Sequence, residues 1–164
     1  CLMTINVIYR RFLQELGDIY ERNEAAHITQ LVFENICHTT KSDIIKQPEL
    51  TLAENDIRKL NIALLDLLKH RPVQYVIGEC EFCQLKIKGS EAVLIPRPET
   101  EEMTAMIIDD LKKFGSKKVL DIGTGSGCIP IAIKKNIQDV VVEAIDLSKD
   151  ALQLAEQKIG RAHV

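Results

Sequence analysis

The sequence has 164 residues, of which 46% are hydrophobic and 27% are charged, and its formal net charge is −3. This composition is that of a globular protein, and no apolar run approaches the roughly 18 to 20 residues that a membrane-spanning helix needs. The weakly acidic balance does not attract a nucleic-acid backbone, so we expect a protein or small-molecule partner. We also expect a monomer without membrane association. Five cysteines in a sequence without a signal peptide indicate reduced thiols and a cytoplasmic location.

Hydrophobic residues at three- and four-residue steps predict helices in the first part of the chain. We expect one helix over residues 5–20 and a second over residues 24–37. Thr51 and Glu54 have the spacing of a capping box, which predicts the start of a third, long helix. Residues 1–70 are therefore predicted to form a small helical bundle.

The pattern changes at Arg71-Pro72, because proline disfavours continued helix and the following residues are β-branched or aromatic. Short strands are expected over residues 74–77, 82–88 and 92–95, with glycines between them. Residues 71–98 are therefore predicted to form a β-hairpin connector to a second domain.

From residue 99 onwards the sequence alternates between helix and strand, which predicts the opening of a doubly wound α/β domain with a parallel sheet. Gly115 is placed to cap the end of the first of these helices. The predicted order is a helix over residues 100–114, a strand over 118–122, a helix that ends near Asn136, a strand over 140–145 and a helix after Ser148. We assign residues 99–164 to this partial domain.

A glycine-rich loop follows the first predicted strand directly. Glycine suits this place because the turn uses backbone angles that side chains disfavour and because a ligand must approach the main chain closely. The N-terminus of the following helix favours an anionic group, such as the carboxylate of a cofactor. The candidate cofactor-binding residues of this loop are Asp121, Gly123, Thr124, Gly125, Ser126 and Gly127.

Asp146 follows the next predicted strand, where a carboxylate can accept hydrogen bonds from two ribose hydroxyls. A nicotinamide dinucleotide site would need a glycine where Cys128 stands, so S-adenosylmethionine is the favoured cofactor. Two simpler interpretations stay open. The loop could be a tight strand-to-helix turn without a ligand, and Asp121 could be an acid that only stabilises the turn.

Two further strings are more specific than the glycine loop. R-P-V-Q-Y-V-I-G over residues 71–78 and L-I-P-R-P-E-T-E over residues 94–101 precede it. Together the three strongly resemble the PrmC/HemK family of peptide chain release factor glutamine methyltransferases, and the resemblance spans most of the chain. It implies a helical bundle that helps to recognise the substrate, a hairpin connector, and a Rossmann-like class I methyltransferase domain.

The same resemblance implies an activity and a set of site residues. The activity is transfer of a methyl group from S-adenosyl-L-methionine to N5 of the glutamine in the Gly-Gly-Gln loop of class 1 release factors. The loop from Gly123 to Gly127 would hold the methionine part of the cofactor, and Asp146 its ribose. The segment before the helix predicted over residues 100–114 is implied to line the site through Pro96, Arg97, Pro98, Glu99, Thr100 and Glu101. Alternatively, this segment is only a rigid proline elbow.

Family members orient the poor amide nucleophile with an N-P-P-Y motif, and no such string occurs in this sequence. We therefore expect no catalytic residue, and no methyl transfer, from these 164 residues as given.

Residues 159–164 can be written back through the genetic code as a sequencing adapter, and our hypothesis is that they are an artefact. A genomic codon run that ends in a stop after Val164 would contradict it.

Other functions stay open at this point. One is a different amino-group methyltransferase, for example one that acts on nucleic acid, and another is a non-catalytic cofactor-binding module. Cys80 and Cys83 form a C-x-x-C pair, but without a second pair we expect neither a zinc site nor a redox site.

Overall fold

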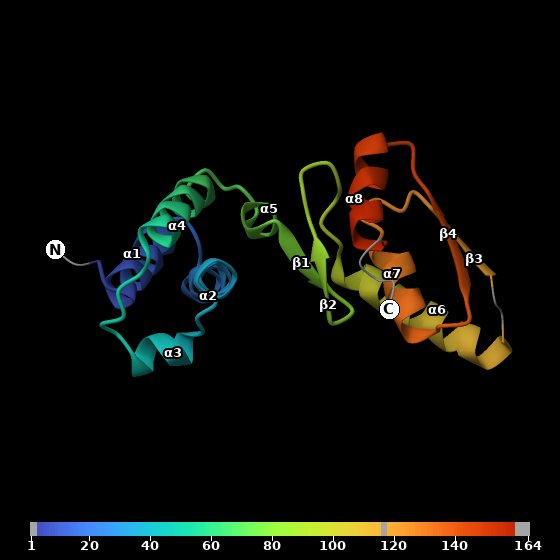
Figure 1. The fold of residues 1–164 in the computed structure, drawn as a ribbon, viewed down its shortest axis with the longest axis horizontal. Coiled ribbons are helices and arrows are strands. Elements are labelled where there is room, and N and C mark those ends of the chain that lie inside the picture. The colour runs from blue at the N-terminus through green and yellow to red at the C-terminus, as the bar shows by residue number, and fades with distance from the viewer. Residues whose placement is uncertain (1–2, 116–117, 160–164) are drawn as a thin grey trace. The chain divides into compact units, whose positions relative to one another are not determined.

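A computed structural model describes residues 3–115 and 118–159, and Figure 1 shows their arrangement. The chain divides into two compact units, Cys1–Ile77 and Gly78–Val164. The division lies after Ile77 and not at Arg71-Pro72, so the hairpin belongs with the second unit. None of the helices in the described residues is both long and apolar enough to span a membrane. Residues 160–164, in the segment interpreted as an artefact, lie outside the described residues.

The first unit is a helical bundle with an aromatic centre. Phe33 is fully buried and meets the rings of Tyr9 and Phe12 edge to face, with ring centroids 5.1 and 5.3 Å away. The helices pack on one another through apolar stripes at helical spacing. They are α1 (Ile5–Gly17), α2 (Arg22–Cys37), α3 (Lys41–Lys46), α4 (Glu54–Leu67) and α5 (Val73–Ile77).

The predicted capping box at Thr51 is wrong. The residue that caps α4 is Ala53, which makes no side-chain hydrogen bond, and Thr51 instead forms an antiparallel bridge with Thr4. A capping box does occur at α3, where the Asp43 amide donates to Thr40 Oγ1 at 3.2 Å and the Thr40 amide donates to Asp43 Oδ2 at 3.0 Å. The spacing alone did not distinguish the two sites.

Residues 74–77 were predicted as a strand and form helix α5 instead. The amides of Tyr75 and Val76 donate to the carbonyl of Pro72 at 3.0 and 3.1 Å, which starts the helical turn. Val73 is buried, and α5 packs against α2 and α4. Packing on the bundle therefore overrides the strand propensity of these β-branched and aromatic residues.

The second unit begins with a β-hairpin of β1 (Glu79–Phe82) and β2 (Leu85–Lys88), which are antiparallel. Its turn residues Cys83 and Gln84 have positive φ angles of 49° and 61°, as in the two-residue turns that suit the strand twist. The single strand predicted over residues 82–88 is therefore wrong, because this turn interrupts it. The strand predicted over residues 92–95 is absent, and these described residues form turns and coil.

The rest of the second unit alternates helix and strand as predicted. Strands β3 and β4 are parallel, with Lys118 opposite Val141 and Ile122 opposite Ile145. Gly115 has the predicted left-handed capping conformation at the end of α6, with φ of 67°. The elements are α6 (Pro98–Phe114), β3 (Lys118–Ile122), α7 (Cys128–Asn136), β4 (Val141–Ile145) and α8 (Lys149–Ile159). The α/β class predicted from the sequence is thus confirmed.

Leu64→Ala should lower the free energy of unfolding of the first unit by about 3 kcal/mol, because it empties a site that is 1% exposed. The matched control is Leu65→Ala, the same change at the next residue of α4. Leu65 is 57% exposed, so this change should cost less than about 1 kcal/mol. Urea unfolding followed by circular dichroism measures both, and equal losses would contradict the described packing.

Candidate functional site

The glycine loop joins the carboxyl end of β3 to the start of α7. Its three glycines Gly123, Gly125 and Gly127 have φ angles of 79°, 53° and 74°, all in the left-handed region that side chains disfavour. The requirement for glycine that the sequence predicted is therefore met at each position. These angles turn the chain sharply, so that the loop lies at the same edge of the sheet as the carboxyl end of β4.

Main-chain hydrogen bonds attach this loop to the end of β4. The amides of Gly123 and Thr124 both donate to the carbonyl of Ile145, at 2.8 and 3.0 Å. Within the loop, the amide of Gly127 donates to the carbonyl of Thr124 at 2.9 Å. The first half of the loop is thus held by the neighbouring strand, and the second half closes on itself as α7 begins.

Asp146 lies beside the loop, as its predicted role in the same site requires. Its Oδ1 accepts from the amide of Ser148 at 2.9 Å and its Oδ2 accepts from the amide of Gly125 at 2.7 Å. These hydrogen bonds, that of Ser148 first and that of Gly125 second, hold the pKa of Asp146 below its ordinary value of 3.8. The carboxylate is therefore ionised at neutral pH and can accept further hydrogen bonds from a ligand.

Two side-chain atoms at the loop are buried and lack a partner among the described residues: Asp121 Oδ2 and Thr124 Oγ1. Leaving a buried polar atom unpaired costs about 1 to 3 kcal/mol. Such atoms in a folded protein are typical of places where a ligand completes the hydrogen bonding. This feature favours a binding site over a ligand-free turn.

Gly127 has a packing role that the other loop glycines lack. A Cβ built on Gly127 would lie 3.0 Å from the Cβ of Ala155 in α8, whereas one built on Gly123 or Gly125 would meet nothing within 4 Å. Gly127 therefore lets α7 begin close to α8. Open space around the other two leaves room for a ligand against the main chain.

The proline-rich segment before α6 is positioned by hydrogen bonds at its ends. Arg97 caps α6, Pro98 is its first residue, and the amide of Thr100 donates to the carbonyl of Arg97 at 3.0 Å. Glu101 Oε2 accepts from the amide of Cys83 at 2.9 Å, which joins the first turn of α6 to the hairpin turn. The site-lining role implied for this segment, which also contains Pro96 and Glu99, stays a prediction.

The hairpin packs against α7, the helix that begins at the glycine loop, and the sequence did not predict this contact. Phe82 and Ile87 are buried in one cluster with Cys128 and Ala132 of α7, the helix that begins at the loop. The sequence pattern that could have predicted this packing is the alternation of apolar residues on either side of the two-residue turn.

Burial, and then the nearby Glu101 carboxylate, raise the pKa of the Cys83 thiol. In the part of the chain that the structure describes, no three His, Cys, Asp or Glu side chains group to hold a metal ion.

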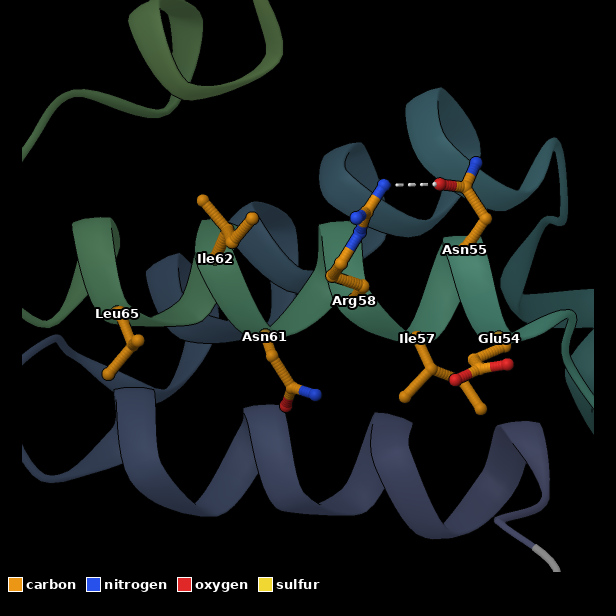
Figure 2. A pocket seen from close by; sticks show the side chains of 7 residues that line it. All are labelled: Glu54, Asn55, Ile57, Arg58, Asn61, Ile62 and Leu65. Carbon is orange, nitrogen blue, oxygen red and sulfur yellow. Dashed lines mark hydrogen bonds between the residues drawn. The ribbon is translucent and has the colours of Figure 1, made fainter.

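A separate groove of about 550 Å³ lies along α4 in the first unit (Figure 2). Ile57, Asn61 and Leu65 point toward α1, whereas Arg58 and Ile62 point away from it. The groove belongs to a different unit from the glycine loop. Its wall is also largely apolar. It is therefore not part of the candidate cofactor site.

Both units match known families. Residues 8–78 match the family model described as the PrmC N-terminal domain, and residues 92–164 match that of the Methyltransferase small domain. A release factor glutamine methyltransferase of Flavobacterium psychrophilum is 37% identical over 158 residues, which is 94% of this chain and 55% of that protein. Those of Bacteroides thetaiotaomicron and Streptococcus pneumoniae are 35% and 36% identical, over 93% and 94% of this chain and 54% of each relative. The chain belongs to the release factor glutamine methyltransferase family.

Membership of the release factor glutamine methyltransferase family confirms the resemblance drawn from the sequence strings. It also identifies the α/β unit as the beginning of a methyltransferase domain, with the glycine loop inside the matched residues 92–164. The chain spans about half the length of the curated relatives it matches. The cofactor-binding roles of the individual loop residues stay a prediction.

Gly127→Ala should lower the free energy of unfolding by about 2 kcal/mol, because it combines left-handed strain with a close contact to Ala155. Gly78→Ala is the matched control, since Gly78 has a φ of +73° with nothing within 4 Å and should lose only the strain, about 1 kcal/mol. Adding Ala155→Gly to Gly127→Ala should show a favourable coupling of about 1 kcal/mol in a double-mutant cycle. Thermal unfolding measures each variant, and zero coupling would show that the contact is unimportant.

Proposed function

We propose that this chain binds S-adenosyl-L-methionine at the glycine loop and belongs to an enzyme that methylates the glutamine of the Gly-Gly-Gln loop in class 1 peptide chain release factors. The observation that supports the cofactor site most directly is the pair of buried, unpartnered atoms Asp121 Oδ2 and Thr124 Oγ1 beside the left-handed glycines. The family supports the reaction, because the matched relatives are named for it.

The residues at the loop fit the charges of this cofactor. S-adenosyl-L-methionine supplies, when bound, a methyl group activated by a positively charged sulfur. Its methionine part has an ammonium and a carboxylate. Asp121 would accept from the ammonium, and the hydroxyl of Thr124 with the N-terminus of α7 would receive the carboxylate. Asp121 Oδ2 and Thr124 Oγ1, the two buried atoms without a partner among the described residues, would then both gain hydrogen bonds.

Asp146 suits the ribose of the same cofactor. Each of its carboxylate oxygens accepts one backbone amide and keeps capacity for a second hydrogen bond. Two neighbouring ribose hydroxyls provide two donors at the spacing of the two oxygens. The lowered pKa keeps both oxygens as acceptors throughout the physiological pH range.

Recognition of the release factor is assigned to the helical first unit. Residues 8–78 match the PrmC N-terminal domain, so they are shared with relatives that are named release factor methyltransferases.

An amide nitrogen is a poor nucleophile because its lone pair is delocalised, so the glutamine amide must be held in line with the methyl group. The groups that would do this are not assigned to any residue here, and the expectation that these 164 residues alone do not catalyse the transfer stays a prediction.

Calorimetry should detect binding of S-adenosyl-L-methionine to the full chain, and Asp121→Asn should weaken it about tenfold, because a charged hydrogen bond contributes about 1.5 to 3 kcal/mol. Glu143→Gln is the matched control, since Glu143 is an exposed carboxylate of β4 and should leave the affinity unchanged. Binding of NAD without binding of S-adenosyl-L-methionine would refute the cofactor assignment.

The full-length gene product, given S-adenosyl-L-methionine and a class 1 release factor, should add one methyl group to the peptide that contains Gly-Gly-Gln. Mass spectrometry of that peptide measures the product. Replacing the glutamine of the release factor by alanine should abolish the signal. Methylation of nucleic acid, with the release factor left unchanged, would contradict the proposed substrate.

A further inference from the structure

Asp146 occupies the junction of two neighbouring strand-to-helix turns. One turn is the glycine loop between β3 and α7, and the other joins β4 to α8. Because β3 and β4 are parallel, the two turns leave the sheet at the same edge. The Asp146 carboxylate accepts one amide from each turn, that of Gly125 in the first and that of Ser148 in the second.

The second turn fixes the direction of the carboxylate. The Ser148 amide, two residues along the chain, donates to Oδ1 at 2.9 Å, which is the local bond of an Asx turn. Ser148 Oγ in turn accepts from the amide of Ala151 at 3.2 Å in the first turn of α8. The carboxylate is therefore held from the α8 side, and its other oxygen reaches across to the glycine loop.

The glycine loop receives its third attachment from this oxygen. The amides of Gly123 and Thr124 donate to the carbonyl of Ile145, and the next amide, that of Gly125, donates to Asp146 Oδ2 at 2.7 Å. The amides of three consecutive loop residues thus donate to two consecutive residues at the end of β4, Ile145 and Asp146. The first two attachments are made by main chain, and only the third depends on the identity of a side chain.

We propose that Asp146 is a positioning residue that holds the glycine loop in its binding conformation before the cofactor arrives, in addition to accepting the ribose. The proposal rests on the proposed cofactor site and adds a second role to one of its residues. A residue that served only as a ribose acceptor would need no bond to Gly125. Here that bond is the shorter of the two that the carboxylate makes.

The variant D146N separates the two turns. An asparagine retains one acceptor oxygen, which can keep the local bond to the Ser148 amide, because asparagine also forms Asx turns. Its NH₂ group would then face the Gly125 amide, donor against donor. The substitution therefore releases the loop while leaving the turn into α8 in place.

A ligand without ribose hydroxyls distinguishes positioning from ribose contact. The probes are S-adenosylhomocysteine and its 2′,3′-dideoxy analogue, titrated by calorimetry into the full chain. D146N should weaken S-adenosylhomocysteine about 100-fold and the dideoxy analogue about tenfold, because loop release affects both ligands and the lost ribose contact affects one. Glu143→Gln, the same chemical change at an exposed site on β4, should alter neither. Equal affinity of D146N and the unmodified chain for the dideoxy analogue would overturn the proposal.

A measurement without ligand keeps the test independent of the proposed function. In the unmodified chain, the Gly125 amide proton and the Asp146 carboxyl carbon should titrate together in NMR spectra. Because the pKa of the Asp146 carboxyl is lowered, the carboxylate should stay ionised at pH values below 3.8, and the bond to Gly125 should be lost only as the pH falls through this lowered pKa. The Gly125 amide should also exchange with solvent about tenfold faster in D146N. Unchanged exchange and no shared titration would overturn the proposal even if S-adenosylhomocysteine binds, whereas failure of the unmodified chain to bind S-adenosylhomocysteine would overturn the proposed function alone.

Discussion

The parallel pairing of β3 with β4 is the constraint on which the candidate site depends. It brings the carboxyl ends of two strands to one edge, so that Ile145 and Asp146 can bind the amides of the glycine loop. A slip of one residue in this register would turn the alternating side chains to the opposite face and separate the carbonyl of Ile145 from the loop. The left-handed glycines are useful only because this neighbouring strand fixes where the loop goes.

Local patterns predicted the second unit well from α6 onward, whereas the strands expected over residues 82–88 and 92–95 are wrong. The bounds of β3 and the capping role of Gly115 follow from short-range chemistry, and both match the structure. The two failures in the first unit lie where tertiary contacts decide. Residues 74–77 have strand propensity but form a helix against the bundle, and Thr51 has the capping spacing but pairs with Thr4. Neither outcome could be predicted from spacing, because the competing partner is distant in the sequence.

The candidate site shows the same division. The sequence predicted that the loop and Asp146 share one site, because both follow strands of a parallel sheet. It did not predict the bond from Gly125 to Asp146, nor the contact of Gly127 with Ala155. The family strings imply a site-lining role for Glu101, which stays a prediction, and they did not predict the bond that Glu101 makes to the hairpin turn. Side-chain direction, which decides such roles, depends on packing rather than on position in a string.

The burial of Phe82 and Ile87 with Cys128 and Ala132 has an evolutionary consequence. These pairs are distant in sequence, yet they share one densely packed volume, in which a gain in size on one side must be matched by a loss on the other. Drift in the hairpin is therefore coupled to drift at the start of α7. Across relatives, the two stretches should covary in side-chain volume, although neither stretch contains a candidate ligand-binding group.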